Sequence, residues 1–570
     1  MLPSKRMRFA LLLLAAIACG GSSRPRDVRA SARDGAVEVW WDPGSFIAAH
    51  RVQLVDLDTG APASAPVLVR GSHALLPGTA SGVWVEAIPG GRTASLVSAG
   101  TGGGSGAAWQ VFAPWDYRDG ALDATFAQLA PGERLAVLLV NFGGPDAAAE
   151  VSVEGTAAAA AAAASSQRLS LAAPALPALH EIVRARESLL ALEPAAPPET
   201  LQSAAHRSFC VVPGLDFARH LRKPATLASS TAHADVYLDD DDLGEYEGTV
   251  LEPLAQAFEE RVWPSITSTF GEPADVDGNG KVLVLLTHEL GLRLNGGWLI
   301  GYFGNADLVR SRDDSPDCSG GGSNHGEIVY LNDPRAGGAN GYAAQDLFAR
   351  VYPATIAHEL QHLLNFWGRC VARRCDGPEE TWINEALSKI AEDLAGYGWN
   401  MDGGRSEGAA YLRRAEGELR GYDGRSLMHW EGDPIGNYQG VHSFLRLFTD
   451  RWGPGLAARI ASGPGGVAGL ESALDLPLPF AMAQWATALL LSNEPGAPYS
   501  FSGAAWSPLH NRLRYLDTRA PGPLALRRDG IAAVMSGPGL GGPARITVRS
   551  GEQTPPHVIV ARVSGALPER

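Results

Sequence analysis

The chain has 570 residues, of which 19% are charged and 45% are hydrophobic, and its formal net charge is −15. This length exceeds what one hydrophobic core supports, so we expect three or four globular domains. The negative charge argues against a protein that neutralises rows of phosphates, so we expect no nucleic-acid partner.

The N-terminus has the pattern of an export signal. Basic residues precede an apolar run over 9–18 that is too short to span a bilayer. Cys19 follows AIA and precedes GGSS, which resembles a bacterial lipoprotein signal. This resemblance implies cleavage after residue 18, acylation of Cys19 and a tether over 19–25. We expect an exported lipoprotein on the outer or cell-surface membrane, with simple secretion as the alternative.

Two stretches with β patterning follow. Residues 26–102 alternate apolar and polar side chains in short runs separated by turns, and their order resembles a fibronectin type III β-sandwich. After a Gly-rich linker, 107–175 again indicates strands and predicts a second β domain. Residues 176–205 predict a helix followed by a Pro-rich linker.

The segment DVDGNG contains a candidate calcium loop. Asp275, Asp277 and Asn279 copy the first half of an EF-hand loop, but Leu286 occupies the position of its bidentate Glu. A tight turn that leads into the strand KVLVLLT is therefore favoured over a calcium site.

The central motif is HELQH within the predicted helix ATIAHELQHLLNFW. On a helix, His358 and His362 lie one above the other, so both rings can reach one metal ion while Glu359 addresses a water molecule. A catalytic zinc needs a third protein ligand. Glu385, on the polar face of the predicted helix WINEALSKIAEDLAG, is the candidate.

The two helices together resemble the gluzincin zinc metallopeptidases, and within them the hyicolysin-type neutral metallopeptidases. HELQHLLNF and WINEALSKIAE carry the resemblance, and GEPADVDGNGKVLVLLT, GYF and SNHGEIVYLN agree with it. It implies an α+β zincin-type domain over 206–495, zinc on His358, His362 and Glu385, and Glu359 as the general base in hydrolysis of extracellular proteins or peptides. It also implies that SNHGEIVYLN is an edge strand antiparallel to bound peptide.

Two further features of this domain are the hydrogen-bond partner of a ligating histidine and the donor to the oxyanion of the reaction. The family commonly places an acid four residues after the ligand Glu, where this chain has Lys389; Glu392 is the candidate replacement as partner of a ligating histidine. Tyr438 and His442 lie four residues apart on a predicted helix, and either could donate a hydrogen bond to an oxyanion. The alternative is that both residues only pack in the core.

Cysteines other than Cys19 form an even set, as expected for an oxidising compartment. Cys370 and Cys375 close a short loop between the two metal-bearing helices, which leaves Cys210 and Cys318 for a second disulfide. Cysteine ligation of a structural zinc is the alternative.

The C-terminal segment 505–570 predicts a further β module. We therefore predict a multidomain chain with N-terminal β-sandwich modules, a central α+β metallopeptidase domain and a C-terminal β module. We expect a monomeric zinc endopeptidase with calcium as a second candidate metal; the rival is a cell-surface adhesin on an inactive or weakly active zincin scaffold.

Overall fold

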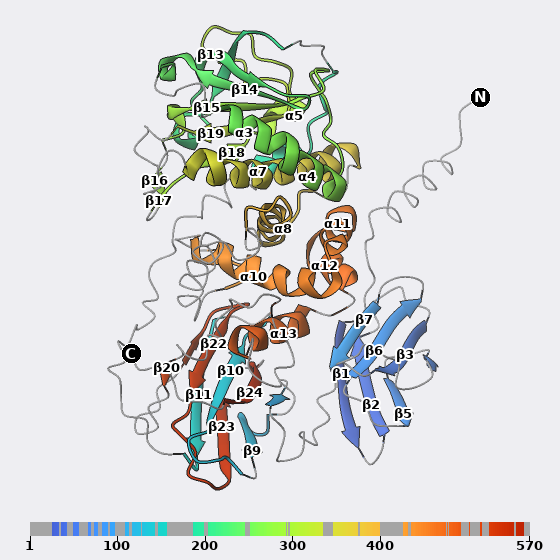
Figure 1. The fold of residues 1–570 in the computed structure, drawn as a ribbon. Helices are drawn as coiled ribbons and strands as arrows, with labels where there is room; N and C mark the ends of the chain where they lie inside the picture. Colours follow the sequence, from blue (N-terminus) through green and yellow to red (C-terminus); the bar gives the residue numbers. More distant parts are fainter. Residues whose placement is uncertain are drawn as a thin grey trace, which may run out of the picture. The chain divides into compact units, whose positions relative to one another are not determined.

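A computed structural model describes much of the chain. The described residues are 26–33, 36–42, 49–55, 67–69, 73–77, 82–88, 92–96, 109–112, 117–126, 128–142, 146–156, 186–198, 203–244, 251–291, 293–294, 297–333, 346–373, 377–398, 426–430, 435–474, 476, 478–491, 501, 514–515, 524–551 and 555–563. They combine helices with several β-sheets (Figure 1). Among these residues, no helix has the length and apolar character that crossing a membrane requires. Cys19 and Cys375 lie outside them.

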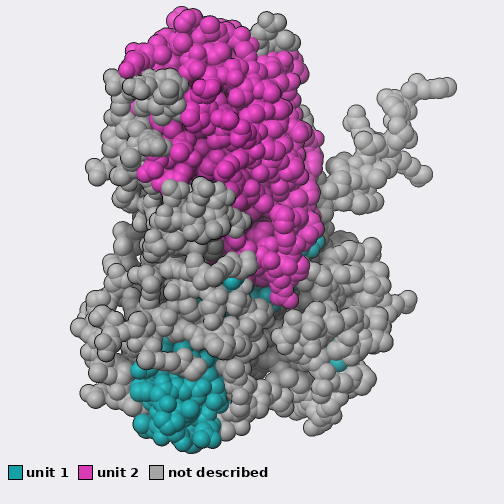
Figure 2. All heavy atoms as spheres, viewed as in Figure 1, with its two compact units in different colours: residues 1–174, 415–430, 467–570 teal, residues 175–414, 431–466 magenta. Residues whose placement is uncertain are grey.

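The chain divides into two compact units (Figure 2). One contains 1–174, 415–430 and 467–570, and the other contains 175–414 and 431–466.

The first β segment forms two antiparallel sheets. One has the order β1-β2-β5 and the other β4-β3-β6-β7. The strands are β1 (Arg26–Arg33), β2 (Ala36–Asp42), β3 (Ala49–Val55), β4 (Val67–Val69), β5 (His73–Pro77), β6 (Gly82–Ile88) and β7 (Arg92–Leu96). The fibronectin-like identity of this segment stays a prediction.

The predicted second β domain and C-terminal β module share their sheets, which corrects their assignment to two separate domains. The sheet orders are β20-β22-β10-β24-β8 and β21-β11-β23-β9, so each sheet mixes strands from both segments. The earlier strands are β8 (Trp109–Phe112), β9 (Ala121–Phe126), β10 (Arg134–Val140) and β11 (Ala147–Glu154); the later ones are β20 (Arg514–Tyr515), β21 (Leu524–Leu526), β22 (Ile531–Met535), β23 (Ala544–Ser550) and β24 (His557–Val563).

One apolar core joins these two sheets. Val137 of β10, Val151 of β11 and Val560 of β24 belong to the same buried cluster. β10 is buried on both faces over most of its length because α13 (Leu478–Leu491) contacts β10 and β24. The apolar sequence of α13 thus belongs to the sandwich, although we predicted residues up to 495 as part of the metallopeptidase domain.

The second unit contains a six-stranded mixed sheet. Its order is β12-β13-β14-β15-β19-β18, in which β14, β15 and β19 run parallel. The strands are β12 (His206–Val211), β13 (Leu221–Ser230), β14 (Ala234–Asp239), β15 (Val282–Thr287), β18 (Gly301–Phe303) and β19 (Ile328–Asn332). The parallel strands are fully buried, as expected where both faces of a sheet are covered.

Helices cover one face of this sheet (Figure 1). Val284 and Leu286 of β15 share a core cluster with residues of α3 (Leu251–Ala257), α4 (Trp263–Phe270) and α7 (Tyr352–Phe366). Leu283 and Leu285 point to the opposite face, where they pack with residues of β12. The alternation along β15 therefore divides the unit into two cores.

The position of the sheet edge differs from the prediction. SNHGEIVYLN contributes β19, which pairs with β15 on one side and with β18 on the other. Among the described strands, β18 rather than β19 lies at the edge. The sequence GYF was too short to be recognised as the edge strand.

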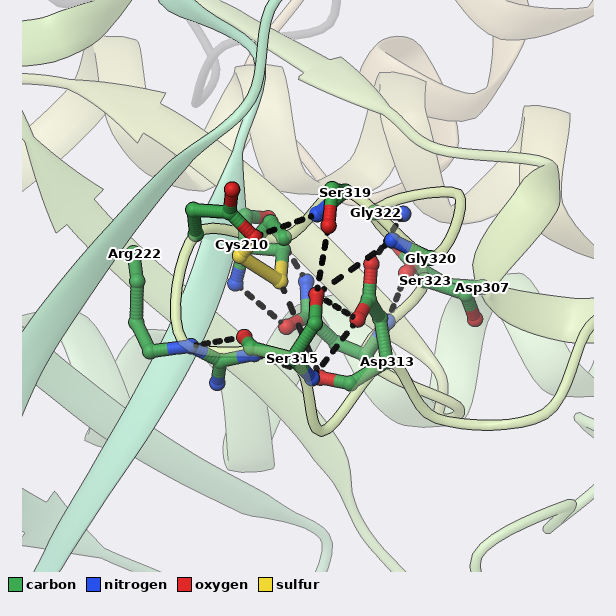
Figure 3. The surroundings of a disulfide bond; sticks show 12 residues. Cys210, Arg222, Asp307, Asp313, Ser315, Ser319, Gly320, Gly322 and Ser323 are labelled. Atoms are coloured by element: carbon green, nitrogen blue, oxygen red, sulfur yellow. Dashed lines mark hydrogen bonds between the residues drawn. A yellow bond between two sulfur atoms is a disulfide. The ribbon is translucent and has the colours of Figure 1, made fainter.

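A disulfide bond joins Cys210 of β12 to Cys318, confirming that prediction (Figure 3). Cys318 lies in the loop 310–323, and Arg222 of β13 donates hydrogen bonds to the Asp313 and Ser315 carbonyls of this loop. The bond and these contacts hold the loop against the sheet. Cys370 is buried, and its predicted pairing with Cys375 stays a prediction.

The shared sandwich predicts that residues 109–154 need the C-terminal strands. Ending the chain at residue 523 removes the partners of β10 and β11 and exposes their apolar faces. We expect segment 109–154 to become sensitive to limited proteolysis, whereas a control chain that ends at residue 563 stays protected. Equal protection in both chains would show that the N-terminal strands fold as an independent domain.

Candidate metal centre

Helix α7 carries the HExxH motif. Its start is favoured by Pro353 in the first turn, and Ile356, Leu360 and Leu363 anchor it in the core. His358 and His362 therefore come to the same side of the helix, with ring centroids 4.9 Å apart.

Helix α8 (Thr381–Leu394) brings the third side chain to this pair. Ile383, Leu387 and Ile390 are buried, and α8 packs against α7. Glu385 Oε2 lies 3.1 Å from His358 Nε2 and 3.5 Å from His362 Nε2. The structure thus brings together the three residues that the sequence analysis named as metal ligands.

The three side chains fit a zinc ion. One possible ligand atom from each of His358, His362 and Glu385 lies within 4.8 Å of the others. Two imidazoles and a carboxylate are a donor set of catalytic zinc sites, which keep a further position open. Burial raises the pKa of Glu385, but the neighbouring His362 and His358 outweigh it and lower that pKa well below the usual range. The carboxylate is therefore ionised, as a metal ligand must be.

The outer nitrogen of His358 has a carboxylate partner. Glu392 Oε1 lies 2.9 Å from His358 Nδ1, and Lys389 Nζ donates a hydrogen bond to Glu392 Oε2. Burial raises the pKa of Glu392, whereas Lys389 and His358 lower it, with a net decrease. An ionised Glu392 orients the ring and directs Nε2 to Glu385. Lys389 therefore supports this carboxylate from the position where the family commonly has an acid.

His362 contacts a different residue of α8. Ser388 Oγ lies 3.2 Å from each nitrogen of its ring and donates a hydrogen bond to Gln361 Oε1. The sequence analysis assigned no role to Ser388. The NEALS spacing, with Ser388 three residues after Glu385, was the available signal.

An open pocket reaches this cluster. His358, Glu359 and His362 line it from α7, Glu385 lines it from α8, and β18 contributes its strand residues. Burial raises the pKa of Glu359, which is 9% exposed. A carboxylate with a raised pKa accepts protons more readily than an ordinary glutamate, as a general base requires.

Tyr438 and His442 lie in different surroundings. Both belong to α10 (Ile435–Trp452), but only Tyr438 is among the described residues that line the pocket. Its ring centroid is 6.1 Å from that of His358. Burial, with the charges of Glu385 and Glu359, raises the pKa of Tyr438 well above its usual range, so its hydroxyl keeps its proton.

His442 is held by a buried carboxylate instead. Its Nε2 lies 2.8 Å from Asp393 Oδ2, and Arg446 donates a hydrogen bond to the same oxygen. His442 is fully buried. This network links α10 to α8, next to Glu392, and was not predicted because its members lie on separate helices.

No protein-family model matches the sequence. The chain is 24% identical over 207 residues to the neutral metalloprotease ShpI of Staphylococcus hyicus. The match spans 34% of this chain and 41% of that protein. This similarity supports a metallopeptidase relationship and, with it, a metal cofactor.

Replacing Asp393 with Asn tests the network that fixes α8 to α10. Burial raises the pKa of Asp393, but His442 and Arg446 outweigh it and lower this pKa to about 2. Removing one partner of a buried ion pair costs on the order of 3 kcal/mol, so we expect Asp393→Asn to lower the free energy of unfolding by about that amount at pH 7.

The pH dependence of this effect has a defined sign. A lowered folded-state pKa contributes stability above the unfolded value near pH 3.8, and this contribution disappears as the pH falls through about 2. The difference between wild type and Asp393→Asn in denaturant unfolding should therefore shrink toward pH 2. A control, Glu252→Gln at an exposed position of α3, should match the wild type. Wild-type stability in Asp393→Asn at pH 7 would contradict the proposed network.

Proposed function

We propose that the protein is a zinc-dependent endopeptidase of the gluzincin type, resembling the hyicolysin-type neutral metallopeptidases. The observation that carries this proposal is the meeting of His358, His362 and Glu385 beside Glu359 in one open pocket. Its proposed substrates are extracellular proteins or peptides. The partial similarity to a neutral metalloprotease supports the same conclusion.

His358, His362 and Glu385 hold the metal in this proposal. When bound, zinc supplies Lewis-acid activation of water and of the scissile carbonyl. Glu359 accepts the proton of the attacking water, because it is adjacent to the ligands in the sequence and its pKa is raised. It then donates this proton to the leaving amine, which returns the carboxylate to its starting state.

Tyr438 is the proposed donor to the developing oxyanion. It lines the same pocket, and its hydroxyl keeps its proton at neutral pH. A donor directed at that oxygen lowers the barrier because the charge appears only as the reaction proceeds. His442 is left with a positioning role through Asp393.

The edge strand β18 is the proposed docking site for the substrate backbone. Its residues line the pocket, and it pairs with β19 along one side. An extended peptide added at the other side would gain backbone hydrogen bonds irrespective of its side chains. Gly301 permits the close packing of β18 against β19 and α7. A Cβ at this position would lie 2.7 Å from the Tyr330 carbonyl oxygen and 2.8 Å from Thr355 Cγ2. The absent side chain lets β18 approach α7.

The location of the enzyme is proposed from the N-terminal sequence alone. The basic residues, the apolar run and Cys19 support an exported lipoprotein, with secretion after simple cleavage as the alternative. Both locations fit a substrate outside the cell.

The reaction is tested with Glu359→Gln. This change keeps the shape of the side chain and the three metal ligands but removes the base. We expect casein hydrolysis by the zinc-loaded variant to fall at least 1000-fold, while its zinc content stays at one per chain. Glu252→Gln, an exposed carboxylate of α3, is the matched control and should retain wild-type activity.

Two outcomes would contradict this proposal, the first in the role of Glu359 and the second in the activity itself. Undiminished, chelator-sensitive hydrolysis by Glu359→Gln would remove Glu359 from the reaction. An inert wild type with one bound zinc would favour the adhesin interpretation of the same scaffold.

Tyr438→Phe tests the oxyanion donor. Removing one such donor lowers turnover by about 100-fold, so we expect kcat to fall by roughly that factor with KM little changed. Tyr117→Phe, in the other compact unit, is the control for loss of a tyrosine hydroxyl. A change confined to KM would instead assign Tyr438 to substrate binding.

A further inference from the structure

Three carboxylates meet at a second place in the metallopeptidase unit. Asp275 and Asp277 lie in the loop between α4 and β15, and Glu327 immediately precedes β19. Because β15 and β19 are neighbouring parallel strands, their first residues lie side by side. The Leu283 backbone N–H donates a hydrogen bond of 2.7 Å to the Glu327 carbonyl oxygen, which fixes this junction.

The spacing of these carboxylates suits one shared cation. One oxygen from each of Asp275, Asp277 and Glu327 lies within 4.8 Å of the others. Calcium binds oxygen ligands at about 2.3–2.6 Å, so two ligands of one ion lie at most about 5.2 Å apart. The three side chains can therefore reach one calcium ion without a large rearrangement.

Glu327 supplies an independent indication of a ligand. This residue is 1% exposed, and its Oε1 accepts a hydrogen bond of 2.9 Å from the Val276 backbone N–H. Its Oε2 is buried and has no hydrogen-bond partner among the described residues. Leaving a buried carboxylate oxygen unpaired is costly, so a cation at this oxygen would offset the penalty.

The excess negative charge of the cluster also favours a divalent cation. Among the described residues, Arg207 forms the ion pair with this cluster, at 3.5 Å from Asp277 Oδ2. If all three carboxylates are ionised, they exceed the one guanidinium by two negative charges. In the absence of a metal, burial raises the pKa of Asp277 to about 6 and that of Glu327 to about 7. A bound cation would stabilise their ionised forms.

The surrounding backbone keeps the cluster compact. Asp275 has a φ of 52°, and its Oδ1 accepts a hydrogen bond from the Gly280 N–H. At Gly326, a Cβ would lie 3.2 Å from Asp277 Oδ2. The absence of a side chain next to Glu327 therefore leaves the Asp277 carboxylate its space.

We infer that Asp275, Asp277 and Glu327 bind a calcium ion that stabilises the metallopeptidase unit. The DVDGNG loop supplies the first half of an EF-hand pattern. Glu327, which immediately precedes β19, takes the part for which an EF-hand uses its twelfth loop residue. An all-carboxylate site prefers calcium to the softer zinc ion. The ion would join the loop before β15 to β19, whose other neighbour is the pocket strand β18.

The second acidic cluster of this unit provides a matched control. Asp239, Asp242 and His288 have similar spacing, but Lys223 Nζ lies 3.6 Å from Asp239 Oδ2 and His288 Nδ1 lies 2.8 Å from Asp242 Oδ1. Both acids of this cluster thus already have a partner side chain within the protein. Asp242→Asn removes a carboxylate of the same burial without touching the proposed calcium site.

The test is a calcium titration of the full-length, zinc-loaded protein, followed by calorimetry and thermal unfolding. We expect one saturable site in the wild type and a rise in Tm of about 5 °C at saturating CaCl2. Glu327→Gln should abolish both responses. Because the amide oxygen can still accept the Val276 hydrogen bond, this variant should fold and have at least the wild-type Tm without calcium. Asp242→Asn should keep the calcium response.

Several results would overturn the inference. They are the absence of saturable binding in the wild type, wild-type calcium affinity in Glu327→Gln, and loss of the response in Asp242→Asn alone.

MgCl2 at equal ionic strength should raise Tm much less, because magnesium demands a smaller octahedral site. An equal rise would identify a general salt effect. Calcium binding is read in zinc-loaded protein without any activity measurement, so its outcome is separate from that of the peptidase proposal.

Discussion

The candidate metal centre depends on how His358 is held at both ends of its ring. Glu392 contacts Nδ1 at 2.9 Å, and Glu385 contacts Nε2 at 3.1 Å. Both carboxylates come from α8, two helical turns apart, so one imidazole sets the position of α8 along α7. This contact is more specific than the apolar packing between the helices, which tolerates small shifts along their axes.

Helix α8 also fixes the position of α10, which contributes Tyr438 to the pocket. Asp393 follows Glu392 and binds His442 and Arg446 of α10, the helix that also carries Tyr438. Three helices are thus connected through buried ionisable side chains. Such groups are costly to separate, which favours a single arrangement of ligands, base and tyrosine. On the sheet side, Gly301 lets β18 lie against α7 and complete the pocket.

The parts of the site that sequence reasoning could predict follow from local geometry. The i, i+4 spacing places His358 and His362 together, and the polar face of the second helix identifies Glu385 and Glu392. Cys210 and Cys318 could be paired because few cysteines are present, although 108 residues separate them. These inferences needed only a helical period or a small set of alternatives.

The remaining features depend on contacts that no local pattern encodes. Leu138 of β10 pairs with Ala533 of β22, so two segments with independent strand patterns proved to share one sandwich. The contact between His442 and Asp393 could not be predicted for the same reason. Glu327 could not be connected with the DVDGNG loop until the parallel pairing of β15 and β19 was known. In each case chain topology, rather than residue type, supplies the missing information.

X-ray diffraction from zinc-loaded crystals at the zinc absorption edge tests the metal site most directly. We expect an anomalous peak bonded to His358 Nε2, His362 Nε2 and a Glu385 carboxylate oxygen, at about 2.0–2.2 Å from each. A crystal in which the zinc peak lies elsewhere, or in which Glu385 stays out of coordination distance while both histidines bind the metal, would contradict it.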